Sequence, residues 1–228
     1  SGLSYNPATD TLFTVSGKRP QLVELSLTGQ VLRSIAIKGA NNLEGVALLE
    51  DGHVAVLDER QRSLMIFRMD ADTRELNRSQ AVQRIALGSL GGSNKGFEGL
   101  AWDKRNQRLL LANEKNPLRL FSLACDGRQV SGPLQALGDL HGHITDVAGL
   151  AIEPRSGQLL LLSQESRLIL SLDGQFAAQN YLVLLPGFNG LTRRVPQAEG
   201  LALDGAGNLY VVSERNLFFA FRREARVP

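Results

Sequence analysis

Seven glutamates recur at equivalent places along the chain and are the residues best suited to chemistry. Some come directly before a repeated glycine, and the others follow an apolar segment. The first set is Glu44, Glu98 and Glu199, and the second set is Glu59, Glu114, Glu165 and Glu214. Carboxylates that gather at one place can bind a hard cation, and Ca²⁺ takes about six to eight oxygen ligands. We therefore expect a calcium site at these residues if the fold brings them together.

Clustered carboxylates repel one another, so something must offset their charge. Two unit charges ~4 Å apart cost about 1 kcal/mol in water and about 4 kcal/mol at an effective dielectric constant near ~20. A bound divalent cation is one form of compensation, and ion pairs within the protein are another. Basic residues stand beside the same acids: Lys18, Arg60, Lys115, Arg167 and Arg215. Clustering also separates carboxyl pKa values, so a general acid and base pair is a third use.

A glycine motif that repeats through the chain indicates which elements position these acids. In each copy an acidic or small residue precedes the glycine, and an apolar residue follows it. The copies are Ser1–Tyr5, Glu44–Leu48, Glu98–Trp102, Ala148–Ile152 and Glu199–Leu203. Their glycines lie 43, 54, 50 and 51 residues apart. This spacing is the period expected of a β-propeller blade.

Every copy continues with a turn rich in Gly, Pro, Asn or Asp and then with short apolar segments, which predicts antiparallel hairpins. The expected second strands are Thr11–Val15, His53–Leu57, Arg108–Ala112, Leu159–Leu162 and Leu209–Val212. The expected third strands are Gln21–Leu27, Ser63–Met69, Leu118–Leu123, Arg167–Leu172 and Leu217–Arg222. The expected fourth strands are Val31–Ile37, Gln80–Ala86, Gly132–Leu140 and Asn180–Leu185. The last copy ends after its third strand, so its fourth strand is expected from upstream of Ser1 or not at all.

The sequence therefore predicts an all-β protein, a β-propeller of about five four-stranded antiparallel blades, as a single domain over residues 1–228. The approximate repeats are residues 1–40, 41–91, 92–143, 144–194 and 195–228. In an antiparallel unit, the start of the first strand lies beside the end of the second. Both sets of glutamates should consequently meet at one mouth of the propeller, where Asp146 can join them. Their neighbours Lys115, Asn116, Arg167 and Arg215 are the candidate ligand-binding residues.

Composition excludes several classes of protein. The chain is 43% hydrophobic and 21% charged, which is typical of a globular protein. Its net charge of +2 comes with no clustered basic stripe, so we expect no nucleic-acid partner. The lone Cys125 cannot form an intrachain disulfide. No apolar run approaches the roughly 20 residues that span a bilayer, so any membrane anchor or signal is expected upstream of the sequence.

Several acidic segments, in order from one end of the chain to the other, resemble the SdiA-regulated family of YjiK-like bacterial proteins. They are Asp58–Arg60, Asn94–Ala101, Glu114–Pro117, Asp146–Val147, Ser163–Arg167, Gln197–Gly200 and Val212–Glu214. The resemblance implies a propeller in the bacterial periplasm or cell envelope, tethered to the inner membrane by an upstream anchor, with calcium at its acidic mouth. NHL-repeat and phytase-like propellers are similar only at the level of fold. Ala148 stands where the pattern would have a glutamate. The sequence therefore predicts an asymmetric metal site that lies nearer to Glu98/Glu114 and Glu199/Glu214.

Three functions follow as alternatives. The first is a binding module that holds calcium and an unknown small molecule or protein at its mouth. The second is a metal-dependent hydrolase, of phosphoesterase or lactonase type, in which the ion activates water. The third is a scaffold without a small ligand, in which paired charges account for the acids. The chain contains no Gly-x-Ser-x-Gly, His-Glu-x-x-His or P-loop motif that would identify a reaction.

Overall fold

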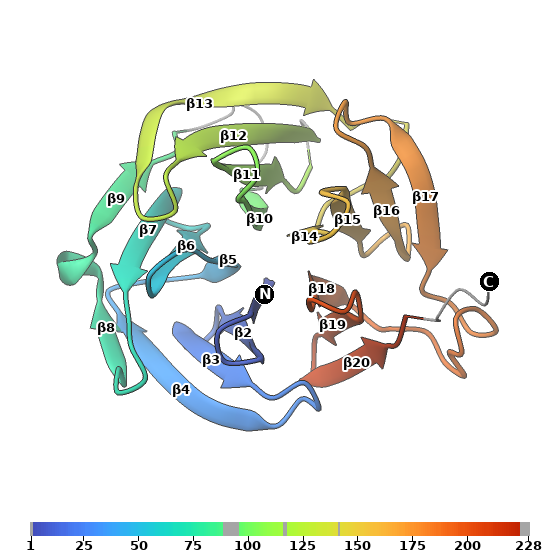
Figure 1. Cartoon of the computed structure of the whole chain (residues 1–228), viewed down its shortest axis with the longest axis horizontal. Coiled ribbons are helices and arrows are strands. Elements are labelled where there is room, and N and C mark those ends of the chain that lie inside the picture. Colours follow the sequence, from blue (N-terminus) through green and yellow to red (C-terminus); the bar gives the residue numbers. More distant parts are fainter. Residues whose placement is uncertain (1, 89–95, 116–117, 141, 224–228) are drawn as a thin grey trace.

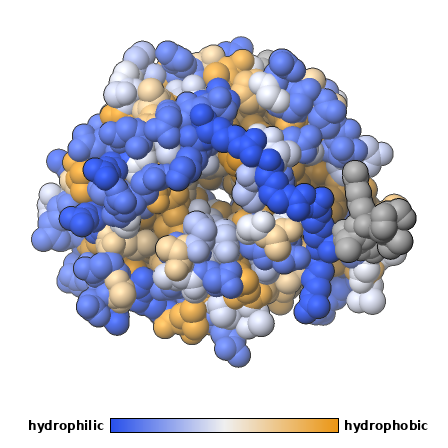
Figure 2. Space-filling model, viewed as in Figure 1, coloured by the Kyte–Doolittle hydropathy of each residue, from blue (hydrophilic) through white to orange (hydrophobic). Residues whose placement is uncertain are grey.

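Five β-sheets stand around a common axis as the blades of a propeller (Figure 1). The computed structural model describes residues 2–88, 96–115, 118–140 and 142–223. In each blade the first strand lies nearest the axis, and successive strands pair antiparallel toward the outside. The predicted fold class is thus confirmed. Figure 2 shows hydrophilic residues over much of the rim of one face, with apolar residues visible mainly between them.

The strands have the following bounds. Blade 1 contains β1 Leu3–Asn6, β2 Thr11–Ser16, β3 Gln21–Leu25 and β4 Val31–Lys38. Blade 2 contains β5 Leu43–Leu48, β6 His53–Asp58, β7 Ser63–Arg68 and β9 Gln83–Ala86. Blade 3 contains β10 Phe97–Asp103, β11 Arg108–Asn113, β12 Arg119–Cys125 and β13 Val130–Asp139. Blade 4 contains β14 Gly149–Ile152, β15 Leu159–Ser163, β16 Leu168–Leu172 and β17 Ala178–Val183. Blade 5 contains β18 Ala198–Leu203, β19 Leu209–Ser213 and β20 Leu217–Phe221.

The segment between β7 and β9 differs from the sequence prediction. After β7 the chain crosses to blade 1, where β8 (Glu75–Asn77) pairs in parallel with the outer strand β4. Lys38 and Glu75 form an ion pair of 2.8 Å at this contact. A 3₁₀ turn, Arg78–Gln80, then returns the chain to blade 2, so β9 begins at Gln83. Blade 1 therefore has a fifth strand, contributed by the chain of blade 2.

The repeated glycines allow the inner strands to approach one another closely. A Cβ atom on Gly45 would lie 2.9 Å from the Leu100 Cβ and 3.1 Å from the Glu98 carbonyl oxygen of the next blade. A Cβ atom on Gly99 would lie 2.6 Å from Leu150. At separations this short, a side chain on either glycine would force the neighbouring inner strand to shift. The glycine period in the sequence therefore records the narrow packing around the axis.

Apolar side chains fill the spaces between neighbouring blades. The cluster between blades 2 and 3 contains Leu57, Ile66 and Leu100, all of them buried. The ring closes between blades 5 and 1 through a smaller buried cluster: Leu3, Leu12, Leu25, Ala202 and Tyr210. In the part of the chain that the structure describes, no strand of one end joins the sheet of the other, so packing of separate sheets closes the ring there. Within the described ranges, no helix is both long and apolar enough to cross a membrane.

Candidate functional site

The same backbone hydrogen bond recurs at one end of three blades and brings the predicted pairs of glutamates together. The Glu59 N–H donates to the Asn42 carbonyl oxygen at 2.9 Å. The Glu114 N–H donates to Gly96 at 3.1 Å, and the Glu214 N–H donates to Gln197 at 3.0 Å. Each bond joins the residue that leaves the second strand to a residue that leads into the first. Glu44 and Glu59, Glu98 and Glu114, and Glu199 and Glu214 thus occupy the same end of the propeller.

A β-bulge lies at each of the three inner glutamates. The register shifts between Leu43 and Gly45, between Phe97 and Gly99, and between Ala198 and Gly200. The unpaired residue in each bulge is Glu44, Glu98 or Glu199. The inner strands β1 and β14, which lack this glutamate, pair with their neighbours without such a shift. A bulge bends its strand and redirects the side chain, so it positions these acids apart from the regular pleat.

Asn42 links two of the acids through its side-chain amide. Its Nδ2 donates to Glu44 Oε1 at 2.8 Å and to Glu59 Oε2 at 2.9 Å. The Gly96 N–H of the next blade donates to Glu59 Oε1 at 3.3 Å. The sequence prediction missed Asn42. Its place two residues before Glu44, at the start of the inner strand, is the signal that could have identified it.

The carboxyl groups at this end perturb one another strongly. Burial raises the pKa of Glu98 to about 9, and the charges of Glu114, Glu44 and Glu59 add to the increase. Burial also raises the pKa of Glu44, to which the charges of Glu199 and Glu59 contribute. Five acids from blades 2, 3 and 5 therefore share one electrostatic site. We call this set the acidic mouth: Glu44, Glu59, Glu98, Glu114 and Glu199.

The other predicted site residues lie outside this set. Glu165 is exposed and forms an ion pair with Lys115 across blades 3 and 4. This contact raises the pKa of Lys115, and the charges of Glu114 and Asp146 act in the same direction. Exposed turns carry the three remaining described residues: Arg167, Glu214 and Arg215. Asn116 lies outside the described residues.

Two buried aspartates hold turns at the same end of the propeller as the acidic mouth. Asp146 accepts hydrogen bonds from the Ser163 hydroxyl and from the N–H groups of Gln164 and Glu165, each N–H at 3.1 Å. Asp58 accepts from the Asn41 N–H at 2.8 Å and from the Gln61 N–H at 3.1 Å. With their oxygens engaged by donors, both carboxylates hold turns in place. Asp146 accordingly belongs to the support of the site.

The atoms at the acidic mouth that could coordinate a metal are carboxylate and amide oxygens, which are the ligands that a hard cation prefers. The described residues nevertheless contain no group of three or more His, Cys, Asp or Glu side chains close enough together to hold a metal ion. The acids interact through their charges without being gathered at ligand distance. Binding a cation would therefore require the glutamate side chains to turn toward it.

Comparisons with known proteins agree with this architecture. A family model described as SdiA-regulated matches residues 1–222. A solved nidogen/laminin complex contains a chain with 17% identity and a TM-score of 0.61, over 96% of this chain and 74% of that one. A luciferin-regenerating enzyme has 14% identity and a TM-score of 0.54, over 93% and 83%. A glutaminyl cyclase from Myxococcus xanthus has 16% identity and a TM-score of 0.66, over 97% and 89%. At these identities the likeness concerns the fold alone.

Proposed function

This chain belongs to the SdiA-regulated family, and from that premise we propose that it is an envelope-associated binding module. Its acidic mouth takes a Ca²⁺ ion together with a small molecule or a protein partner. The observation that carries the proposal is the raised pKa of Glu98, about 9, among the other carboxyl groups of the acidic mouth. A carboxyl group with this pKa holds a proton at neutral pH. A divalent cation can take the place of that proton and offset several negative charges at once.

Glu98 is the residue most directly involved, since burial and the charges of Glu114, Glu44 and Glu59 raise its pKa to about 9. Glu114 and Glu44 are the two neighbours whose charges act most strongly on it, so they are the expected further ligands. When bound, calcium would supply positive charge and open coordination positions for a ligand's oxygens. Asn42 keeps Glu44 and Glu59 oriented beside each other. Calcium affinity should fall at lower pH, because protons compete for the same oxygens.

Thermal unfolding in EDTA and then in a calcium series tests this proposal. A ligand that binds only the folded state stabilises it by about 2.7 kcal/mol at a hundredfold excess over Kd. The double variant Glu98→Gln/Glu199→Gln should lose this stabilisation. Glu50→Gln, at the opposite end of the propeller in an ion pair with Lys104, should retain it. No calcium-dependent shift in the parent protein, or an equal shift in the double variant, would exclude the site.

A hydrolase is the second candidate, and the state of Glu98 favours it. A carboxyl group kept neutral at pH 7 can donate a proton as a general acid. Two proteins that share this fold, the luciferin-regenerating enzyme and the glutaminyl cyclase, are enzymes by name. A panel of phosphoesters and lactones, assayed with and without Ca²⁺, tests for turnover. Activity that Glu98→Gln abolishes supports the hydrolase, whereas calcium binding without turnover supports the binding module. If the protein shows neither calcium binding nor turnover, the third alternative, a scaffold without a small ligand, is supported.

The family resemblance is the support for the proposed envelope location. Fractionation of bacteria that express the natural protein tests it. Recovery with the periplasm or the inner membrane supports the location, and recovery with the cytosol contradicts it.

A further inference from the structure

The connection from β17 to β18, residues 184–197, forms a compact loop at the same end of the propeller as the acidic mouth. The Leu184 N–H donates to the Arg167 carbonyl oxygen at 2.9 Å, in the turn between β15 and β16. The Val195 N–H donates to the Leu184 carbonyl oxygen at 3.4 Å, so the loop is closed at its base. Within it, the Gly187 N–H donates to the Leu191 carbonyl oxygen at 2.8 Å. Figure 1 shows this connection extending outward from the ring beside blade 5.

Two exposed aromatic side chains belong to this part of the molecule. Phe188, within the loop, is 52% exposed, and Tyr181, on the outer strand β17, is 70% exposed. The Asn189 Nδ2 donates to the Val183 carbonyl oxygen at 3.0 Å, which holds the turn that carries Phe188 beside the end of β17. Aromatic side chains that stand out among basic residues are typical of segments that lie at a membrane–water interface.

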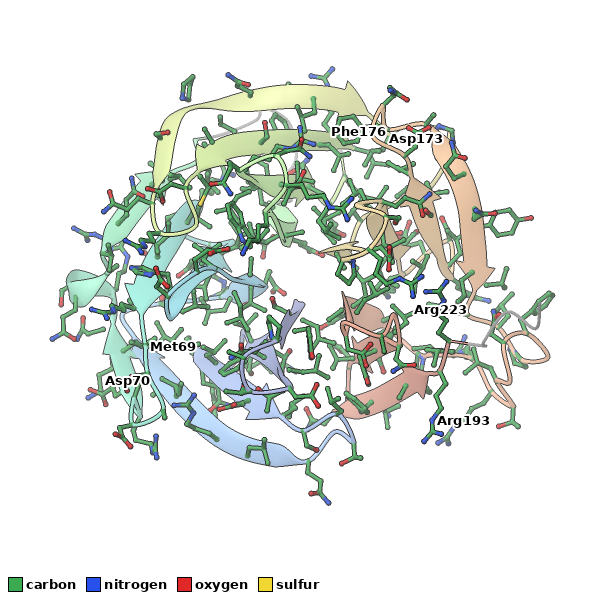
Figure 3. The ribbon with its side chains drawn as sticks, viewed as in Figure 1. Met69, Asp70, Asp173, Phe176, Arg193 and Arg223 are labelled. Carbon is green, nitrogen blue, oxygen red and sulfur yellow. The ribbon has the colours of Figure 1, made fainter. Side chains whose placement is uncertain are left out.

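Four exposed arginines lie on the same loop and on the turns beside it. Arg193 and Arg194 belong to the loop, and Arg167 lies at its base. Arg215 lies in the turn between β19 and β20, which is hydrogen-bonded to Gln197 at the end of the loop. Among the residues that the structure describes, none of the four has a carboxylate within ion-pair distance. Figure 3 shows Arg193 on the outer side of the ring. We call this set the blade 4–5 rim: Arg167, Tyr181, Phe188, Arg193, Arg194 and Arg215.

Positive charge is compensated differently at the two ends of the propeller. At the end opposite the acidic mouth, ion pairs occupy exposed basic residues: Lys104 with Glu50, Arg128 with Asp51 and Arg155 with Glu153. At the blade 4–5 rim, Glu214 is the exposed acid beside Arg215, and Glu165 is already paired with Lys115. Positive charge therefore exceeds negative charge at the rim, which favours an anionic partner.

We propose that the blade 4–5 rim binds the surface of a bilayer that contains anionic phospholipid. The arginines pair with lipid phosphates, and Phe188 and Tyr181 enter the headgroup region. A specific protein interface commonly buries about 800 Å² on each partner around an apolar core. The rim instead presents two aromatic side chains, on a projecting loop and an outer strand, among arginines. This contact goes beyond the calcium site, because the acids of the mouth lie on the inner strands and in the turns next to them and take no part in it.

Vesicle sedimentation tests the proposal. The purified propeller is mixed in EDTA with vesicles of phosphatidylcholine, either alone or with phosphatidylglycerol, so that the result does not depend on calcium. The double variant Arg193→Glu/Arg194→Glu changes the rim. Its matched control is Arg68→Glu/Arg84→Glu, which makes the same charge change at two exposed positions of blade 2. The fluorescence of Phe188→Trp reports insertion, measured against the parent, in which Trp102 is the only tryptophan.

We expect the parent to bind vesicles that contain phosphatidylglycerol and not phosphatidylcholine alone, with affinity that falls as salt rises. Each basic residue near such a surface contributes about fivefold, so the rim variant should bind at least about tenfold more weakly. The blade 2 variant should bind nearly as tightly as the parent, and the emission of Phe188→Trp should shift to shorter wavelength. Absence of binding, equal binding to both kinds of vesicle, an equal loss in the blade 2 variant or an unshifted emission would overturn the proposal.

Discussion

The two ends of the propeller both carry acidic residues but surround them differently. At the hairpin end, where the first and second strands of each blade connect, the acids face donors. Asp103 accepts from Asn106 at 2.8 Å and from Arg108 at 2.9 Å. Asp204 accepts from the Asn208 side chain at 2.8 Å and from the Tyr210 hydroxyl at 2.9 Å. At the acidic mouth the acids act on one another through their charges, although Asn42 and the Gly96 N–H also donate to two of them.

One carboxyl group at each end has a shifted pKa, and the two shifts are opposite in direction. Burial alone would raise the pKa of Asp204, but hydrogen bonds from Asn208, Tyr210 and Ala206 lower it below its usual value. At the acidic mouth, burial and neighbouring carboxylates raise the pKa of Glu98 to about 9. Burial also raises the pKa of Tyr210 to about 12, and its hydrogen bond to Asp204 adds to the increase. Carboxylates that accept several hydrogen bonds, as at the hairpin end, stabilise the fold. Carboxylates that lie near other carboxylates, as at the acidic mouth, are suited to bind a cation.

The largest expected effect is at the hairpin end. Asp204→Ala removes the acceptor for a buried tyrosine hydroxyl and for two backbone N–H groups. Leaving buried donors unsatisfied costs about 1–3 kcal/mol each, and each kcal/mol lowers Tm by about 2–4 °C in a chain of this size. Calorimetry measures the loss. Asp173→Ala is the control, because Asp173 makes similar hydrogen bonds in an exposed turn (Figure 3). Equal losses would contradict the role of burial.

The next effect is an increase in stability at high pH, and it comes from Glu98. Because the folded-state pKa of Glu98 is raised from 4.5 to about 9, the folded protein holds a proton that the unfolded chain has released. This contribution to stability is complete below the unfolded pKa and is lost as pH rises through the folded pKa. Glu98→Gln should therefore flatten the decline of Tm between pH 5 and pH 9 in EDTA. Thermal scans at both pH values measure it, and parallel profiles for variant and parent would contradict it.

A smaller effect is expected from the link between two acids of the mouth. Asn42→Ala removes the donor shared by Glu44 and Glu59, so their repulsion is less compensated. We expect a loss of about 1 kcal/mol at pH 8 and a smaller loss at pH 4, because the raised pKa of Glu44 leaves that carboxyl group with less charge at low pH. Urea denaturation at the two pH values provides the comparison. Asn41→Ala is a suitable control, because the hydrogen bond of Asn41 to Asp58 comes from its backbone N–H.

The smallest effect should come from an exposed ion pair at the hairpin end. Lys104 and Glu50 join neighbouring blades at 2.8 Å, and the Lys104 side chain is 71% exposed. Exposed pairs of this kind contribute about 0.2–1 kcal/mol and are screened by salt. Lys104→Ala should change Tm by no more than about 4 °C, and the difference should vanish in high salt. A larger, salt-independent change would show that the contrast between the two ends rests on more than donor burial.

The fold was predictable because short local sequence signals specify each blade: a close-packed glycine, a turn and short apolar strands. The sharing of one mouth by Glu44, Glu98 and Glu199 followed from strand order. The bulges at these residues were not predictable, since they depend on pairing register. The role of Asn42 depends on side-chain geometry between two segments. The different settings of Asp146 and Glu98 depend on donors and charges from other strands. The crossing strand β8 is polar and short, so it gave no pattern.

The crossing of β8 onto blade 1 has a mechanical consequence. Blades 1 and 2 are fastened by backbone pairing between β4 and β8, whereas among the described residues no strand pairing joins blades 5 and 1, which meet mainly through packed side chains. Blades 5 and 1 are also the only neighbouring pair that do not follow each other directly along the described chain. If a pulling force is applied to the N- and C-termini, the propeller should open between blades 5 and 1. Blade 5 should unfold first, and blades 1 and 2 should unfold later and as one unit.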